Sequence, residues 1–263
     1  MVRTRLDTLL VDRGLYDSRS RAAAAVMAGD VRLEDGRGAA AKPGQLVDQD
    51  VAVAVAEPPA YVSRGGIKLA NALEAFAIDV SARRCLDVGA STGGFTDCLL
   101  QRGAAEVVAV DVGYGDLHWR VRQDPRVAAI ERTNARSLTP ARLPYRPDLI
   151  VADVSFISLT KVLPAVLACA SERFDCLALV KPQFEVGRAR VGKGGVVRSA
   201  EDRRAALVAV GACIERLGYQ VLGYRSSGLA GPAGNRESFV WAAQPGAGAA
   251  VADLDRAARR AEP

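Results

Sequence analysis

The sequence predicts an α/β fold, a doubly wound sheet of seven strands, preceded by a smaller α+β domain. From about residue 82 onward, short apolar segments alternate with segments of helical periodicity, which is the pattern of βαβ units around a mostly parallel sheet. The run Glu57-Pro58-Pro59-Ala60 interrupts the periodic patterns, because proline pushes the residue before it toward extended conformations. We therefore expect domains at residues 1–58 and 64–245, a linker at 59–63, and a tail at 246–263 that is helical or frayed.

The composition excludes several classes of protein. Of the 263 residues, 49% are hydrophobic and 25% are charged, as in ordinary globular domains. No stretch approaches the ~20 apolar residues that cross a bilayer, and the N-terminus shows no apolar signal core. We therefore expect a cytoplasmic protein without a membrane span. The net charge of +5 permits an anionic partner without requiring one.

Cysteine and histidine usage narrows the chemistry further. The five cysteines lie far apart and form no Cys-x-x-Cys pair, so we expect neither a disulfide scaffold nor a metal site. His118 is the single histidine, which excludes mechanisms that need several imidazoles. Catalysis is therefore expected to depend on lysine and carboxylate side chains.

The N-terminal segment predicts two short helices and a small sheet. Apolar residues at helical spacing run from Leu6 to a stop at Gly14, and Ser18 is suited to cap a second helix that ends at Gly29. A strand is expected at 31–33, followed by turns at Asp35-Gly36 and at 42–44, and then an alternating strand at 51–55. The strands of the larger domain are expected at residues 85–88, 107–111, 127–131, 149–153, 176–181, 221–224 and 239–242.

A glycine-rich turn follows the first of these seven strands and leads into a helix. Its spacing, Gly89-x-x-x-Gly93-Gly94, differs from the dinucleotide fingerprint, and no Lys-Ser/Thr phosphate motif is present. The turn therefore suits a ligand without a pyrophosphate. Asp111 ends the next strand, where an acidic side chain binds the ribose hydroxyls of adenosine cofactors in such folds. Together they predict an S-adenosylmethionine site, the alternative being a ligand-free turn with a capping aspartate.

Four charged residues lie at or beyond the predicted strand ends. Because the carboxyl ends of the strands meet at one crevice, we expect these residues to cluster there, although each one alone could equally be a solvated surface charge. Transfer of a methyl group to a ribose hydroxyl needs a base, and a lysine serves only when its neutral form is favoured. A neighbouring ammonium and a sulfonium would favour neutral Lys181, while Asp153 would orient it. The expected catalytic residues are Lys68, Asp153, Lys181 and Glu237.

Taken together, these motifs resemble the TlyA family, whose members are similar to FtsJ-type ribosomal RNA methyltransferases with an added RNA-binding domain of the ribosomal-protein-S-four type at the N-terminus. The resemblance spans nearly the whole chain and also includes Arg5-Leu6-Asp7 and Gly29-Asp30-Val31 in the N-terminal module. The motifs that carry it in the larger domain are Val62-Ser63-Arg64-Gly65-Gly66-Ile67-Lys68-Leu69, Asp87-Val88-Gly89-Ala90-Ser91-Thr92-Gly93-Gly94-Phe95-Thr96, Asp111-Val112-Gly113-Tyr114-Gly115, Glu131-Arg132-Thr133-Asn134, Asp153-Val154-Ser155-Phe156-Ile157-Ser158 and Val180-Lys181-Pro182-Gln183-Phe184-Glu185.

The resemblance implies a function. It implies 2'-O-methylation of cytidine in 16S and 23S ribosomal RNA, S-adenosylmethionine as donor, ribosomal subunits as partners, and a Lys-Asp-Lys-Glu tetrad at the four positions named above. The segment Pro59-Ala60-Tyr61-Val62 departs from the Arg-x-Trp-Val that members often carry. This departure puts in question whether the linker couples RNA binding to cofactor binding. The implied cofactor-binding residues are Asp87, Gly89, Ala90, Ser91, Thr92, Gly93, Gly94, Phe95, Asp111, Asn134 and Asp153.

RNA contacts are expected on two basic surfaces. Residues 1–56 contain eight Lys/Arg and eight Asp/Glu, so only a one-sided arginine face could follow phosphates there, and a solvated face is the alternative. A glycine-rich cationic loop at 187–195 follows the proposed base and could close over an RNA backbone. The candidate RNA-binding residues are Arg3, Arg5, Arg13, Arg19, Arg21, Arg64, Arg132, Arg188, Arg190 and Lys193.

Three other functions stay open from the sequence. The same fold could serve as a non-catalytic RNA-binding factor in ribosome assembly, or it could methylate a base instead of a ribose. Members of the family have also been named haemolysins, but a membrane-active protein needs an exposed, strongly amphipathic helix or an apolar hairpin.

Overall fold

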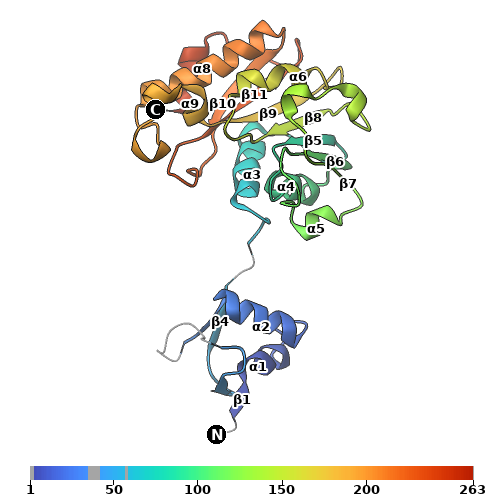
Figure 1. Cartoon of the computed structure of the whole chain (residues 1–263), viewed down its shortest axis with the longest axis vertical. Coiled ribbons are helices and arrows are strands. Elements are labelled where there is room, and N and C mark those ends of the chain that lie inside the picture. Colours follow the sequence, from blue (N-terminus) through green and yellow to red (C-terminus); the bar gives the residue numbers. More distant parts are fainter. Residues whose placement is uncertain (1–2, 35–41, 57–58, 263) are drawn as a thin grey trace. The chain divides into compact units, whose positions relative to one another are not determined.

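The computed structural model describes residues 3–34, 42–56 and 59–262, and the chain divides into two compact units, Met1–Pro59 and Ala60–Pro263 (Figure 1). The turn expected at Asp35-Gly36 and the first half of the run Glu57-Pro58-Pro59-Ala60 lie outside the described residues. Within the described ranges, no helix is long and apolar enough to cross a membrane.

The N-terminal unit contains both predicted helices, α1 (Leu6–Asp12) and α2 (Arg19–Ala28). The hydroxyl of Ser18 accepts the backbone N–H of Arg21 at 3.4 Å, and Gly29 ends α2 with φ +84°. Strand β2 (Val31–Leu33) pairs antiparallel with β4 (Val53–Val55), and β1 (Arg3–Arg5) pairs antiparallel with β3 (Leu46–Asp48). Strands β1 and β3 were not predicted, because the segment Arg3–Arg5 carries no apolar residue and the segment Leu46–Asp48 carries only two.

The larger unit contains a sheet of seven strands in the order β10-β11-β9-β8-β5-β6-β7. All seven predicted strands are present, and their cores read as continuous apolar runs because both faces of the sheet are covered. Their bounds are β5 (Arg84–Val88), β6 (Glu106–Val110), β7 (Val127–Ile130), β8 (Leu149–Ala152), β9 (Asp175–Val180), β10 (Gln220–Ser226) and β11 (Ser238–Ala243).

Strand direction places one crevice at the middle of this sheet. Strands β5, β6, β7, β8 and β9 are parallel to one another. Strand β11 is antiparallel to both β9 and β10. The chain starts at the central β5, adds β6 and β7 on one side, and then returns to β8 on the other side. The carboxyl ends of β5 and β8 therefore form the switch point where ligands bind in doubly wound folds.

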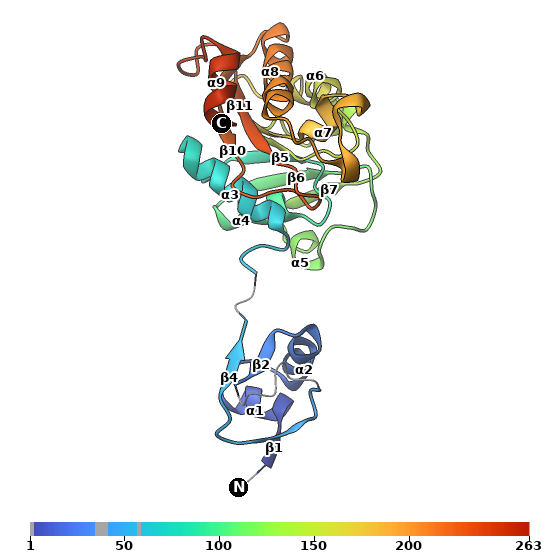
Figure 2. The ribbon, with the colours of Figure 1, turned by 90° about the vertical axis from the view of Figure 1, so that its left-hand side faces the viewer.

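Helices cover both faces of the sheet (Figure 2). One apolar core packs α6 and α8 on the sheet and includes the buried Ala258 of α9, and the other packs α3 and α4 on the opposite face. The tail at 246–263 thus contains a helix that joins the core. The helices are α3 (Arg64–Phe76), α4 (Gly94–Gln101), α5 (Trp119–Arg122), α6 (Leu163–Leu167), α7 (Pro182–Glu185), α8 (Ala200–Arg216) and α9 (Leu254–Ala261), with 3-10 turns at Ala135–Ser137, Pro140–Arg142, Leu159–Lys161, Arg188–Arg190 and Lys193–Gly195.

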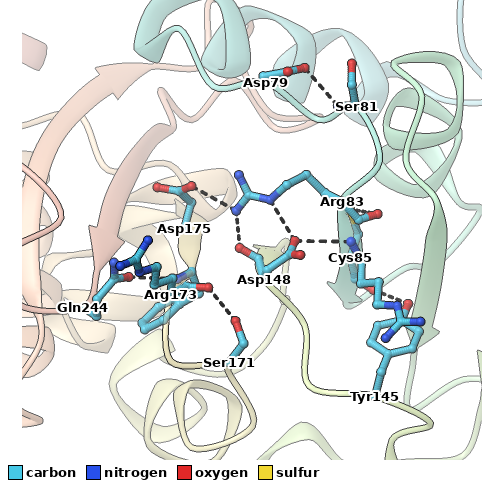
Figure 3. Close-up of polar contacts among 12 residues, drawn as sticks. Asp79, Ser81, Arg83, Cys85, Tyr145, Asp148, Ser171, Arg173, Asp175 and Gln244 are labelled. Atoms are coloured by element: carbon cyan, nitrogen blue, oxygen red, sulfur yellow. Dashed lines mark hydrogen bonds and ion pairs between the residues drawn. The ribbon is translucent and has the colours of Figure 1, made fainter.

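An ion-pair cluster fixes the amino ends of the central strands (Figure 3). Arg83, which precedes β5, donates to Oδ1 of Asp148 at 2.7 Å and to Oδ2 of Asp175 at 3.0 Å. These carboxylates lie at the starts of β8 and β9. One guanidinium therefore links three neighbouring strands at the edge opposite the crevice, which fixes their relative positions.

Candidate active site

The glycine-rich turn brings the loops after β5 and β8 into contact. Gly89 has φ +85°, and a Cβ atom on it would lie 2.5 Å from the carbonyl oxygen of Asp153, so only glycine fits there. Gly93 adopts φ +91° at the start of α4. Ser91 has φ +47°, which is uncommon for a residue with a side chain. Its N–H donates to Oδ2 of Asp111 at 2.7 Å, and this bond supports the unusual conformation.

The Asp111 carboxylate is fixed from two sides. Oδ2 accepts the N–H of Ser91, and Oδ1 accepts the N–H of Gly113 at 2.7 Å. Each carboxylate oxygen has two acceptor sites, so both oxygens keep a site for an external hydroxyl group. A rigid carboxylate at the end of β6 is thus available for ribose hydroxyls, in agreement with the role expected for it.

Two cavities lie side by side at the crevice and share part of their walls. The first has a volume of about 460 Å³ and is lined by residues that include Asp111 and Asn134. The second has a volume of about 410 Å³ and is lined by residues that include the four charged residues of the predicted tetrad. Both cavities are lined by Gly89, Ser91, Asp153 and Ser155. An elongated cofactor with a nucleoside at one end fits this pair of cavities.

The tetrad forms two ion pairs in the second cavity. Nζ of Lys181 lies 2.5 Å from Oδ1 of Asp153, and it also donates to the hydroxyl of Ser155 at 3.0 Å. Nζ of Lys68 lies 2.5 Å from Oε2 of Glu237, and both of these side chains are almost completely buried. One cavity therefore brings together residues from α3, from the segment before β11, and from the ends of β8 and β9.

The expected cofactor-binding residues differ in which of the two cavities they line. Thr92, Gly94 and Phe95 line the second cavity together with Ala90, whereas Gly93 lines neither cavity. Asn134 lines the first cavity, and its side chain also caps the 3-10 turn at Ala135–Ser137.

Asp87 is buried beneath the turn and lines neither cavity. Thr96 donates its hydroxyl to Oδ2 of Asp87 at 2.6 Å, while Oδ1 has no partner among the described residues. Burial raises the pKa of Asp87 to about 7, although the Thr96 hydrogen bond acts in the opposite direction. Asp87 therefore supports the turn from below and does not face a ligand directly.

Two further residues lie at the crevice, of which sequence reasoning missed Ser155. Ser155 lines both cavities, and its position two residues after Asp153 was the only signal available. Phe156 has φ +64° and is 93% exposed, with its ring 5.4 Å from that of Phe184. Phe156 also lines the first cavity.

The candidate RNA-binding residues of the larger unit differ in how they are held. Arg188 and Lys193 are exposed, whereas Arg190 donates to the carbonyl of Val186 at 2.9 Å and pairs with Asp202. Arg64 donates to the carbonyl of Ala230 at 2.9 Å and lines the second cavity. The guanidinium of Arg132 lies 4.2 Å from the centre of the Tyr114 ring.

The five candidate RNA-binding arginines of the N-terminal unit all have partners within that unit. Arg5 and Arg19 both pair with the buried Asp7. Arg13 donates to the carbonyls of Gln49 and Val51 at 2.5 and 2.7 Å, which is a structural role. The remaining two pairs are Arg3 with Asp48 and Arg21 with Asp17. Four of these five arginines therefore form ion pairs with aspartates, and the fifth binds backbone carbonyls.

Comparison with known proteins decides the family. The model of the FtsJ-like methyltransferase family matches residues 61–244. A TlyA protein of Mycobacterium tuberculosis, named 16S/23S rRNA (cytidine-2'-O)-methyltransferase, is 54% identical over 241 residues, which cover 91% of this chain and 89% of that protein. The chain belongs to the TlyA family of FtsJ-like methyltransferases. Family membership establishes a methyltransferase with S-adenosylmethionine as its methyl donor, as the glycine-rich turn and Asp111 predicted.

Other TlyA relatives carry a different name. Hemolysin A of Brachyspira hyodysenteriae is 42% identical over 195 residues, which cover 74% of this chain and 80% of that protein. A solved structure of a hemolysin-designated protein from Streptococcus thermophilus is 37% identical, with a TM-score of 0.73 and coverage of 99% of this chain and 96% of that chain. A structure from Listeria monocytogenes described as an S-adenosylmethionine-dependent methyltransferase is 12% identical with a TM-score of 0.51, and it supports the fold alone.

Proposed function

We propose that this TlyA-family protein methylates the ribose 2'-hydroxyl of a cytidine in ribosomal RNA, with Lys181 as general base. The observation that carries this proposal is the position of the Lys181 amine, which lines the second cavity and contacts Asp153 and Ser155, two residues that line both cavities. The name of the Mycobacterium tuberculosis relative supports cytidine in 16S and 23S rRNA as the target.

The hydrogen bonds of Lys181 suit a base. A neutral primary amine has two N–H bonds and one lone pair. The Ser155 hydroxyl accepts a hydrogen bond from Nζ, and the Asp153 carboxylate lies beside Nζ as its ion-pair partner, so the amine is oriented and its lone pair can face a substrate hydroxyl in the cavity. When Nζ takes the proton of that hydroxyl, the resulting ammonium is stabilised by the Asp153 carboxylate.

The chain's residues account for binding and proton transfer. Asp111 and Asn134 would hold the nucleoside end of S-adenosylmethionine, and the turn at Gly89 would contact its centre. When bound, the cofactor supplies an electrophilic methyl group on a sulfonium sulfur. Lys181 would remove the proton of the ribose hydroxyl as its oxygen takes the methyl group, the methyl–sulfur bond breaking to leave a neutral thioether. Lys68, which is paired with and oriented by Glu237, lines the same cavity as Lys181.

The RNA would be bound outside the crevice. We assign the N-terminal unit to RNA binding of the S-four type, and Arg188 and Lys193 to contacts with the RNA backbone near the crevice. A ribose hydroxyl inside a duplex cannot approach the methyl group in line, so the target nucleotide has to leave its helix. The proposed partners are the ribosomal subunits, and the proposed location is the cytoplasm.

The test is a methyl-transfer assay on ribosomal subunits from cells that lack this protein. The purified chain and methyl-labelled S-adenosylmethionine are expected to give labelled 2'-O-methylcytidine after digestion of the rRNA to nucleosides, identified by mass spectrometry. The Lys181→Ala variant should bind the cofactor but transfer at least about 100-fold more slowly. A base-methylated nucleoside would overturn the ribose assignment, and absence of transfer by the wild-type chain would favour an assembly factor.

A further inference from the structure

Glu262 is a buried carboxylate that lies beyond the part of the chain matched by the family model. Its side chain is 4% exposed, and Oε1 accepts from Nε of Arg203 in α8 at 2.6 Å. The guanidinium of Arg236, the residue before Glu237, lies 3.7 Å from the same oxygen. A buried ion pair needs good geometry and further hydrogen bonds to offset the loss of hydration. The other hydrogen bonds of Arg203 therefore show which parts of the chain this pair holds.

Arg203 extends the contact from Glu262 to the end of the cationic loop. It is 9% exposed, and its Nη1 atom donates to the carbonyls of Val197 and Arg198 at 3.2 and 2.7 Å. The Glu262 carboxylate and these two carbonyls thus surround one guanidinium. The segment that follows the loop at 187–195 is held by this guanidinium.

Asn235 connects the same segment to the loop that carries Glu237. It is 1% exposed, its Oδ1 atom accepts the N–H of Val197 at 2.9 Å, and its Nδ2 atom donates to the carbonyl of Gly195 at 2.8 Å. Val197 is therefore fixed through its carbonyl by Arg203 and through its N–H by Asn235. Asn235 precedes Glu237 by two residues, and its own carbonyl accepts the N–H of Gly231 at 2.8 Å.

We infer that Glu262 is a positioning residue for methyl transfer, which acts through Arg203 and Asn235 on the loop that presents Glu237 to Lys68. The inference rests on the proposed function for its kinetic consequence, but the positional claim stands on the contacts alone. Glu262 touches neither cavity, so it does not act on substrate or cofactor directly. The tail after residue 245 thereby becomes part of the active-site support.

The first measurement is amide hydrogen exchange on the full-length chain without RNA or cofactor. In the Glu262→Gln variant, exchange should rise at least about fivefold for the N–H groups of Val197, Gly231 and Ser227, the last of which donates to the Glu237 carbonyl. Exchange at Ser91 and Gly113, which bond to Asp111, should not change. Unchanged exchange at Val197 and Gly231 would overturn the inference whether or not the protein is active.

The second measurement is methyl transfer by the same variants. Glu262→Gln should lower kcat about tenfold while the Kd for S-adenosylmethionine stays within about twofold, because the first cavity, which would hold the nucleoside, is lined by no residue of this network. Glu262→Asp keeps the charge and should recover most of the lost kcat. Asp255→Asn is the matched control, since it removes an exposed carboxylate that pairs with Arg259 on the same helix at 2.7 Å.

These outcomes separate the two proposals. Increased exchange with an inactive wild-type chain would reject the proposed function and keep the positional role. A fall in thermal stability of Glu262→Gln with wild-type kcat below the unfolding temperature would show a structural role only and would overturn the inference. Equal losses of kcat in Glu262→Gln and Asp255→Asn would overturn it as well.

Discussion

Lys68 and Glu237 are separated by 169 positions in the sequence, yet Nζ of one lies 2.5 Å from Oε2 of the other in a buried ion pair. Helix α3 supplies the ammonium, and the segment before β11 supplies the carboxylate. Gly231 is placed so that a Cβ atom would meet Oε1 of Glu237, which leaves room for the carboxylate only beside glycine. The pair is therefore built by two segments, α3 and the loop between β10 and β11.

Breaking this pair should cost stability as well as activity. Lys68→Met leaves the Glu237 carboxylate buried without its counterion, which should destabilise the chain by about 3–5 kcal/mol. The double variant Lys68→Met/Glu237→Gln should recover a large part of that loss, because no buried charge remains, but it should stay inactive. Chemical denaturation and methyl transfer measured on the same samples check this. Recovery of activity in the double variant would contradict the assigned role of Lys68.

The Ser155 hydroxyl should contribute to the rate and not to cofactor affinity. Ser155→Ala removes the hydroxyl that accepts from the Lys181 amine, and the amine becomes less well oriented. We expect kcat to fall about tenfold, the value of one hydrogen bond of about 1.4 kcal/mol, with Ser155→Thr close to wild type. Ser171→Ala, at the opposite edge of the sheet (Figure 3), is the control. A wild-type kcat in Ser155→Ala would show that Asp153 alone orients the lysine.

The Asp111 carboxylate should determine cofactor affinity. Asp111→Asn keeps the shape of the side chain but removes its negative charge and one of its two acceptor oxygens. The amide therefore cannot accept the N–H groups of Ser91 and Gly113 and also two ribose hydroxyls. The Kd for S-adenosylmethionine should rise about 10- to 100-fold, and kcat at saturating cofactor should change little. Isothermal titration calorimetry measures the first quantity. Asp116→Asn, an exposed position on the same loop, should bind like wild type, and equal effects in both variants would exclude a specific role for Asp111.

Asp87 should make the stability of the chain depend on pH. Burial raises its pKa from 3.8 to about 7, so between these values the folded chain binds a proton that the unfolded chain has lost. The contribution of this group is therefore fully present below about pH 4 and is lost as the pH rises through about 7. In Asp87→Asn, the fall in unfolding free energy between pH 4 and 8 should be smaller, by a few kcal/mol.

The control for this prediction is Asp79→Asn. Asp79 is an exposed carboxylate whose pKa is lowered by hydrogen bonds from Ser81, so its contribution to stability changes in the opposite direction with pH. Urea denaturation at several pH values measures both variants against the wild type. An unchanged pH dependence in Asp87→Asn would show that the Asp87 carboxyl titrates in its ordinary range.

The sequence predicts the parts of the fold and site that depend on local pattern. Seven strands were predictable because each contains a short apolar run, and Asp153 and Lys181 were predictable because each directly follows a buried apolar run. Asp87 was expected to contact the cofactor, yet its side chain lies beneath the turn, since alternation along β5 directs it away from the cavities. The Glu262–Arg203 contact has no local signal, because the two residues are 59 positions apart.

The cationic loop should govern RNA affinity through charge. Arg188 and Lys193 are exposed at 187–195, whereas Arg190 is bound to Val186 and Asp202. The double variant Arg188→Ala/Lys193→Ala should raise the KM for ribosomal subunits about tenfold and reduce the slope of log affinity against log salt by about 1–2, with kcat retained. Arg173→Ala, an exposed arginine at the opposite edge of the sheet, should leave both quantities unchanged. A fall in kcat at an unchanged salt slope would place these two side chains in loop positioning instead, because a phosphate contact acts on the affinity for RNA.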